Sequence, residues 1–73
     1  MGTWHYQIQE FCYTDVLDVC HTYYQMIEVY SSGAKTENGI TPMGETPEEL
    51  INELERMIAD AKKYPHLTKA DKE

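Results

Sequence analysis

A helix begins within the stretch Gly44-Glu45-Thr46-Pro47-Glu48-Glu49-Leu50, which carries three independent start signals. Thr46 is the expected N-cap, because its hydroxyl can accept a hydrogen bond from a free backbone N–H of the first turn. Pro47 follows at the first helical position, where the missing N–H costs nothing. Glu49 is expected to complete a capping box by reaching back to the N–H of the cap. The second half of the chain is therefore predicted to be helical.

The residues after this start repeat with the period of an amphipathic helix. The apolar positions recur at steps of three and four: Leu50, Ile51, Leu54, Met57, Ile58 and Ala61. Lys62 and Lys63 complement the helix dipole in the last turn, and Pro65 ends the helix because it displaces the preceding residue from helical backbone angles. We expect residues 65–67 to pack back as a short cap and Thr68 to Glu73 to form a frayed tail.

The first residues of the chain show the alternation of a β-strand. In Thr3-Trp4-His5-Tyr6-Gln7-Ile8-Gln9 the even positions are large and apolar and the odd positions are polar. Because neighbouring side chains on a strand point to opposite faces, Trp4, Tyr6 and Ile8 are expected to face the core together.

A hairpin is predicted in the middle of the chain. Tyr24 to Tyr30 is rich in aromatic and branched residues, Ser31-Ser32-Gly33 is a turn signal, and Ala34 to Asn38 is expected to form a short third strand. A helix over residues 15–30 is the competing interpretation, although branched and aromatic residues lose rotamer freedom in a helix. Residues at helical spacing in that segment are Val16, Cys20, Tyr23, Ile27 and Tyr30.

These elements predict an α+β fold in which a three-stranded antiparallel sheet packs on one C-terminal amphipathic helix (β-β-β-α). A single domain is expected over residues 1–67, followed by a flexible C-terminal tail over residues 68–73. A chain of this size buries only about 60% of its unfolded surface, so its core is thin. We therefore expect a partner or a second copy of the chain.

The charge balance argues against several classes of function. The chain has 73 residues with 6 Lys+Arg against 13 Asp+Glu, which gives a net charge of -7 at pH 7. Nucleic acids and anionic membranes both attract Lys and Arg, so neither is expected as a direct partner. No stretch approaches the roughly 20 apolar residues that span a bilayer. The N-terminus has no features of a secretory leader, which predicts a cytoplasmic protein.

Four short motifs resemble those of a family of small, mostly uncharacterised bacterial proteins with the patterns W-x-Y, E-V-Y, T-E-N and P-x-G-E-[ST]-x-E-E-L. In this chain they read Trp4-His5-Tyr6, Glu28-Val29-Tyr30, Thr36-Glu37-Asn38 and Pro42-Met43-Gly44-Glu45-Thr46-Pro47-Glu48-Glu49-Leu50. The resemblance implies three antiparallel strands followed by one helix, and it brings no catalytic residues with it.

The segment from Gly44 to Glu49 is also similar, more faintly, to the strand-to-helix step of HicB-like antitoxins. Those proteins add a further strand after the helix and often a DNA-binding segment. Residues 65–73 are expected to be too short and too polar to supply either. This similarity also implies no catalytic residues.

Residue types that bind metals or attack substrates are present but poorly spaced. Zinc ligands usually come in pairs separated by two to four residues, and no such pair occurs among His5, Cys12, Cys20, His21 and His66. A reactive cysteine needs a nearby cation, and no Lys or Arg precedes Lys35. A solvated turn accounts for Asp15 and Asp18. We therefore predict no metal, no cofactor and no catalytic site, and two cysteines are too few for a disulfide framework.

Aromatic residues are concentrated near the start of the chain: Trp4, Tyr6, Phe11, Tyr13, Tyr23, Tyr24 and Tyr30. One helix covers only one face of a sheet, so the surplus rings are expected on the open face. Tyrosine is enriched at protein interfaces because its ring is apolar and its tip is polar. The predicted interface residues are Tyr13, Tyr23, Tyr24 and Tyr30.

The leading hypothesis is a small non-catalytic protein-interaction module that forms homodimers or holds a protein partner. Most cations gather late in the chain, so the rest presents an acidic surface. Such a surface can imitate phosphate spacing, and an acidic inhibitor of a nucleic-acid enzyme, of the DNA-mimic or anti-defence type, is the first alternative. An antitoxin-like partner of a small toxin is the second alternative. Steep weakening of partner binding by salt would favour the inhibitor.

Overall fold

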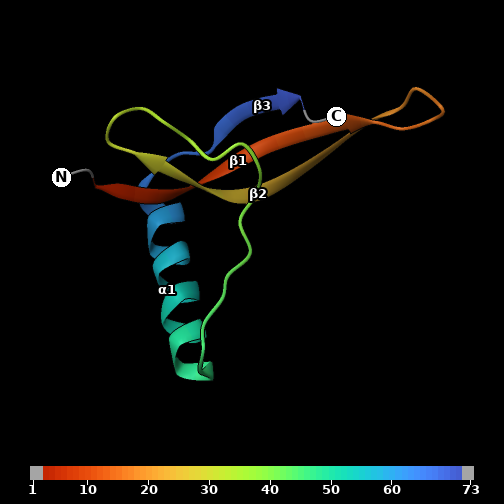
Figure 1. Cartoon of the computed structure of the whole chain (residues 1–73). Helices are drawn as coiled ribbons and strands as arrows, with labels where there is room; N and C mark the ends of the chain where they lie inside the picture. The colour runs from red at the N-terminus through yellow and green to blue at the C-terminus, as the bar shows by residue number, and fades with distance from the viewer. Residues whose placement is uncertain (1–2, 72–73) are drawn as a thin grey trace.

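The computed structural model describes residues 3–71, which form one sheet of three strands and one helix (Figure 1). The elements are β1 (Trp4–Thr14), β2 (Cys20–Tyr30), α1 (Pro47–Lys63) and β3 (Leu67–Asp71). The strand order is β2-β1-β3, with β2 antiparallel and β3 parallel to the central strand β1. The α+β class is confirmed, whereas the predicted all-antiparallel sheet and β-β-β-α order are wrong. The sheet is mixed, and its third strand follows the helix.

α1 begins where the sequence predicts. The Oγ1 atom of Thr46 accepts a hydrogen bond from the N–H of Glu49 at 3.1 Å. The Oε1 atom of Glu49 accepts a hydrogen bond from the N–H of Glu45 at 3.1 Å. The capping box was expected to use the N–H of Thr46, so the observed donor lies one residue earlier in the chain. Gly44 packs against this turn, and a Cβ atom there would lie 2.5 Å from the backbone nitrogen of Leu50. Glycine is therefore required sterically where the chain enters the helix.

The largest difference from the sequence prediction lies after α1. Residues 67–71 form β3 beside β1 instead of ending a short cap and starting a frayed tail. Side chains of β1 hold this part of the chain: Nε2 of Gln7 donates to the carbonyl of Pro65 at 2.6 Å, and Nε2 of Gln9 donates to the carbonyl of Thr68. β3 thus depends on tertiary contacts that its own sequence does not show. The last two residues of the expected tail, 72 and 73, lie outside the described part.

The predicted third strand over residues 34–38 is also wrong. The turn before it forms as expected, with Gly33 in the left-handed region at φ 97° and its N–H bonded to the carbonyl of Tyr30. The chain then returns along the outer edge of β2 without forming a strand. The contacts that hold it there are an isolated bridge between Val29 and Lys35 and hydrogen bonds from Thr36 N to Glu28 O and from Ile40 N to Met26 O.

The helical alternative for residues 15–30 is wrong. β2 pairs with β1 in continuous register from Thr14 opposite Cys20 to Trp4 opposite Tyr30. Branched and aromatic side chains fit this pleated arrangement better than a helix. The residues between the strands form a tight turn, which completes a long two-stranded hairpin.

The core lies on both faces of β1. The buried apolar residues are Tyr6, Phe11, Cys12, Ile27 and Met57. Of the three residues expected to face the core, Tyr6 is buried and Trp4 and Ile8 are partly buried. Gln7 and Gln9 on the opposite face are buried as well. Their amides are satisfied by the carbonyl of Pro65, just before β3, and by the carbonyl of Thr68 within β3. The helix was expected to cover one face of the sheet and to leave the other face open. This expectation is incorrect at β1, where both faces are buried.

α1 meets the sheet with its C-terminal half, and its N-terminal end points away from the sheet (Figure 1). The Oδ2 atom of Asp60 accepts a hydrogen bond from the N–H of Tyr6 at 2.9 Å. The guanidinium of Arg56 lies 4.1 Å from the centre of the Trp4 ring, and Met57 is the helix residue that becomes buried. The sheet therefore covers only part of the apolar stripe of α1.

Candidate interaction site at the hairpin tip

The turn between β1 and β2 lies at the end of the hairpin remote from α1 (Figure 1), and it carries exposed apolar side chains. We call residues 15–19 the hairpin tip. Val16 is 99% exposed and Leu17 is 79% exposed, and Val19 is also exposed. A single exposed apolar residue is ordinary, but adjacent ones on a protruding turn suit contact with another molecule.

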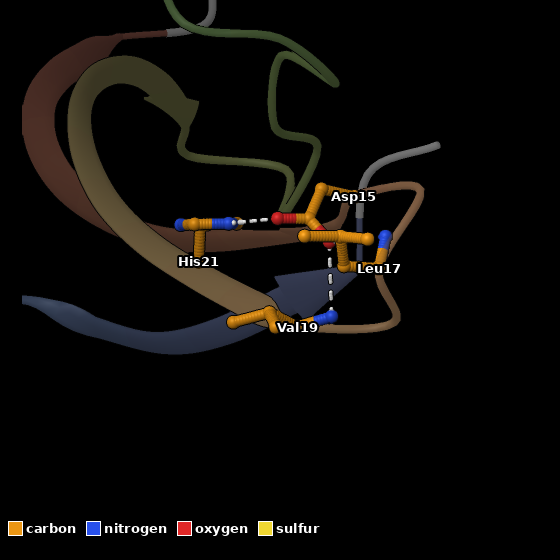
Figure 2. Close-up of polar contacts among 4 residues, drawn as sticks. All are labelled: Asp15, Leu17, Val19 and His21. Carbon is orange, nitrogen blue, oxygen red and sulfur yellow. Dashed lines mark hydrogen bonds and ion pairs between the residues drawn. The ribbon is translucent and has the colours of Figure 1, made fainter.

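Asp15 fixes the backbone of the hairpin tip (Figure 2). Its Oδ1 atom accepts hydrogen bonds from the N–H of Leu17 at 2.8 Å and from the N–H of Val19 at 3.0 Å. The N–H of Asp15 donates to the carbonyl of Val19, and the N–H of Asp18 donates to the carbonyl of Asp15. An aspartate commonly closes a turn in this way, by bonding backbone groups a few residues ahead. The tip is thus held by hydrogen bonds instead of apolar packing.

The backbone at Asp18 takes a conformation that most residues avoid. Its φ angle is 66°, in the left-handed region. Aspartate tolerates this region better than branched residues, because its short polar side chain can bond locally. The alternation of aspartate with apolar residues in the tip therefore has a structural reason: the aspartates shape the turn and the apolar side chains point outward.

His21 connects the tip to β2. Its Nε2 atom lies 2.6 Å from Oδ2 of Asp15, as Figure 2 shows. The hydrogen bond with His21, and those from the N–H groups of Val19 and Leu17, lower the pKa of the Asp15 carboxyl below its ordinary value of 3.8. Asp15 therefore carries a negative charge at neutral pH, next to the exposed apolar side chains.

Aromatic rings on one face of the hairpin lead from the core to the tip. The register sets Phe11 opposite Tyr23 and Tyr13 opposite His21, and directly opposed residues share a face. The ring centres of Phe11 and Tyr23 are 5.5 Å apart, those of Tyr13 and Tyr23 are 5.9 Å apart, and those of Tyr13 and His21 are 4.9 Å apart. We call these four residues the aromatic ladder. Phe11 is buried and Tyr13 is about half exposed, so the ladder passes from core to surface.

The structure divides the four predicted interface tyrosines between two faces. Tyr13 and Tyr23 belong to the aromatic ladder. Tyr24 and Tyr30 lie on the other face of the hairpin, where they pair with Glu10 and Trp4 of β1. Tyr13, Tyr24 and Tyr30 are exposed, and Tyr23 is partly buried. The residues are therefore not gathered on one surface, and only the first pair lies near the hairpin tip.

Contacts of Tyr24 and Tyr30 lie away from the tip. The Tyr24 ring meets the His66 ring edge-on, with centres 6.1 Å apart. The hydroxyl of Tyr30 donates to Oε1 of Glu28 at 2.6 Å, and this bond raises the pKa of Tyr30 above its ordinary value. Tyr30 also packs beside Trp4. These tyrosines take part in the packing of the opposite face.

The cysteines have a cationic neighbour that the sequence prediction did not include. Nζ of Lys69 lies 3.8 Å from Sγ of exposed Cys20, because β3 returns to the side of β1. Electrostatic interaction with the Cys20 thiol, and then with the thiol of buried Cys12, raises the pKa of Lys69. Neither cysteine forms a disulfide, and residues 3–71 contain no cluster of three or more His, Cys, Asp or Glu residues that could hold a metal ion. The expectation that no cation approaches these cysteines is therefore wrong.

Sequence reasoning missed Val16 and Leu17 as candidate contact residues. The available signal was a pair of apolar residues enclosed by Asp15 and Asp18, which are turn formers. Reading residues 15–30 as a possible helix obscured this signal, because Val16 then joins an apolar repeat. The register of the hairpin resolves the matter by placing both residues in the turn.

No protein-family model, no curated protein and no solved structure matches this chain. Within residues 3–71, the helix is neither long nor apolar enough to cross a membrane. The same residues enclose no pocket. The features that bear on function are therefore the exposed surface and the hydrogen bonds that shape it.

Proposed function

We propose that this protein is a non-catalytic interaction module that binds a partner protein by inserting its hairpin tip into an apolar pocket. The observation that supports this function is the exposure of Val16 and Leu17 on a turn that Asp15 holds in one conformation. A turn that is already ordered loses little conformational entropy on binding. Apolar side chains that fill a partner's pocket commonly provide much of the binding energy.

The charge of the tip indicates the chemistry of the partner. Asp15 and Asp18 flank the two apolar side chains, whereas the cation at this end of the hairpin, Lys69, lies beside Cys20 at the start of β2. The complementary surface is an apolar pocket with Lys or Arg at its rim. Charges at such a rim increase the association rate more than the final affinity.

The tip alone gives only modest affinity. Full burial of a valine or leucine side chain contributes roughly 1.5–3 kcal/mol, and association itself costs at least about 4 kcal/mol. Val16 and Leu17 together therefore barely offset that cost. Half-exposed Tyr13 in the adjacent aromatic ladder is the next available contact, and we include it in the proposed surface.

A capture experiment with the whole chain tests this function. Immobilised wild-type protein should retain a specific protein from a lysate, and the Leu17→Ser variant should lose it. Met43→Ser is the matched control, because Met43 is also strongly exposed but lies in the segment that leads to α1. Equal capture by wild type and Leu17→Ser, or no specific capture by wild type, would contradict the proposal.

Salt dependence separates this function from the acidic inhibitor. Insertion of apolar side chains should persist at high salt, whereas an imitation of phosphate charges should fail there. The structure gives the inhibitor less support than the sequence, because Lys69 lies beside Cys20 of β2 and Arg56 lies over the Trp4 ring of β1, which places two cations among the sheet residues.

The presence of β3 favours an antitoxin-like partner of a small toxin as a second candidate. Residues 65–73 were expected to be too short to supply a strand after the helix, yet Leu67–Asp71 forms one. In this case the protein captured through the tip would be a toxin. Wild type should relieve its effect on growth, and Leu17→Ser should not.

A further inference from the structure

α1 carries an apolar surface that the sheet leaves uncovered. Ile51 is 54% exposed, Ile58 is 56% exposed, and Leu54 between them is also exposed. Their spacing of three and four residues places them on one side of the helix. We call these three residues the helix stripe. It lies on an element other than the hairpin tip and is therefore a separate surface.

We propose that the helix stripe binds the helix stripe of a second copy of this chain, with the two helices antiparallel. The charges beside the stripe indicate the occupant and its direction. Glu48, Glu55 and Lys62 are exposed and seven residues apart, so they form one row along a flank of the stripe. The row is acidic at its N-terminal end and basic at its C-terminal end.

A two-fold axis through the middle of the stripe brings these rows together. In an antiparallel pair, Glu48 of each copy lies beside Lys62 of the other, which gives two attractive pairs by symmetry. Glu55 lies near the axis and meets its own counterpart, which gives one repulsive pair. A parallel arrangement would instead align the acidic ends and the helix dipoles of both copies. The charge pattern is therefore self-complementary only in the antiparallel direction.

Much of α1 extends beyond the sheet. The N-terminal end of α1 points away from the sheet (Figure 1), and the sheet contacts Arg56, Met57 and Asp60 toward the other end. A 17-residue helix is about 25 Å long, so two helices can overlap along the whole stripe. Three apolar residues per copy bury less than the roughly 1,200 Å² of a stable interface. We therefore expect a weak dimer that forms with increasing concentration.

Sedimentation equilibrium of the whole chain over a wide concentration range tests the dimer. Wild type should pass from monomer to dimer, and Ile58→Asp should weaken dimerisation about tenfold or more, since burial of a charge then opposes contact. Leu17→Ser at the hairpin tip is the matched control and should leave the equilibrium unchanged. A monomer at every concentration, or an equal effect of both variants, would overturn the proposal. Either result leaves the proposed function of the tip untouched.

Charge variants test the direction of the helices without removing an apolar residue. Glu48→Lys and Lys62→Glu should each weaken the dimer, and the double variant should restore it because the pairs are exchanged. Glu55→Gln should strengthen the dimer by removing the repulsion at the axis. Failure of the double variant to recover would overturn the antiparallel arrangement. Circular dichroism of each variant checks that α1 remains folded.

Discussion

Asp15 organises the hairpin tip although its side chain is at the surface. Its carboxylate accepts hydrogen bonds from the N–H groups of Leu17 and Val19 and meets Nε2 of His21. The sequence indicates a turn at Asp15, but it cannot show that His21 will lie within reach, because this depends on the register of the hairpin. At the scale of single residues, the candidate site was therefore predictable as a turn but not as a fixed apolar protrusion.

Acid should loosen the hairpin tip, because folding lowers the pKa of Asp15. A carboxyl group with a lowered folded-state pKa stabilises the fold at pH values above its ordinary pKa, which is 3.8 for Asp15. That stabilisation is lost as the pH falls through the pKa that Asp15 has in the folded protein. In an NMR titration, the amide resonances of Leu17 and Val19 should shift together below about pH 4.

The Asp15→Asn variant is the control for this titration. Its side-chain oxygen can still accept a hydrogen bond from the turn, but it cannot be protonated in this range. The amides of Leu17 and Val19 should then show no common transition below about pH 4. An unchanged transition in Asp15→Asn would assign the effect to another group.

The secondary-structure elements differ in how far their own residues determine them. β1 and α1 each carry a clear hydrophobic period and so could be predicted from sequence. β3 has no such pattern, and it becomes a strand because Gln7 and Gln9 hold the nearby chain beside the free edge of β1. Residues 34–38 looked more like a strand, but they reach only the outer edge of β2, where they form an isolated bridge.

The start of α1 is held by its cap, so Thr46→Ala should destabilise the protein. The variant leaves the N–H of Glu49 without its side-chain acceptor. Loss of an N-cap typically costs about 1 kcal/mol. Urea unfolding followed by far-UV circular dichroism should show that decrease in the free energy of unfolding.

Thr46→Ser provides the comparison, because it keeps the hydroxyl that accepts the bond. Its free energy of unfolding should remain within about 0.5 kcal/mol of wild type. Equal losses in Thr46→Ala and Thr46→Ser would attribute the effect to the lost methyl group and not to the cap.

The whole molecule is arranged around β1, which has neighbours at both edges and buried residues on both faces. A sequence alone could not show this, because Gln7 and Gln9 look like solvent-facing positions of a one-sided sheet. Their burial depends on carbonyl groups from the far end of the chain. The division of the four tyrosines between two faces has a local cause instead, because Tyr23 and Tyr24 are neighbours on β2 and so point to opposite faces.

Replacement of Gln7 by leucine should destabilise the protein, whereas the same replacement of Gln25 should not. Gln7→Leu removes the donor to the carbonyl of Pro65 and should lower the free energy of unfolding by about 1–3 kcal/mol. Oε1 of Gln25 is buried and has no hydrogen-bond partner within residues 3–71. Gln25→Leu should therefore leave stability unchanged or raise it by up to about 1 kcal/mol.

Urea unfolding monitored by the fluorescence of Trp4 measures both variants under the same conditions. Hydrogen exchange should also show faster exchange in β3 for Gln7→Leu and not for Gln25→Leu, because only Gln7 contacts the chain that leads to β3. Similar losses of stability in both variants would contradict a specific role for the bond to Pro65.

The parallel pairing of β3 with β1 has a consequence for synthesis of the protein on the ribosome. β1 is synthesised early. β3, which pairs with the edge of β1 opposite β2, is translated more than 50 residues later. At roughly 5–20 residues per second, that edge stays open for several seconds. Unpaired strand edges promote aggregation, so crowded polysomes or slow elongation between the strands would expose nascent chains to misassembly.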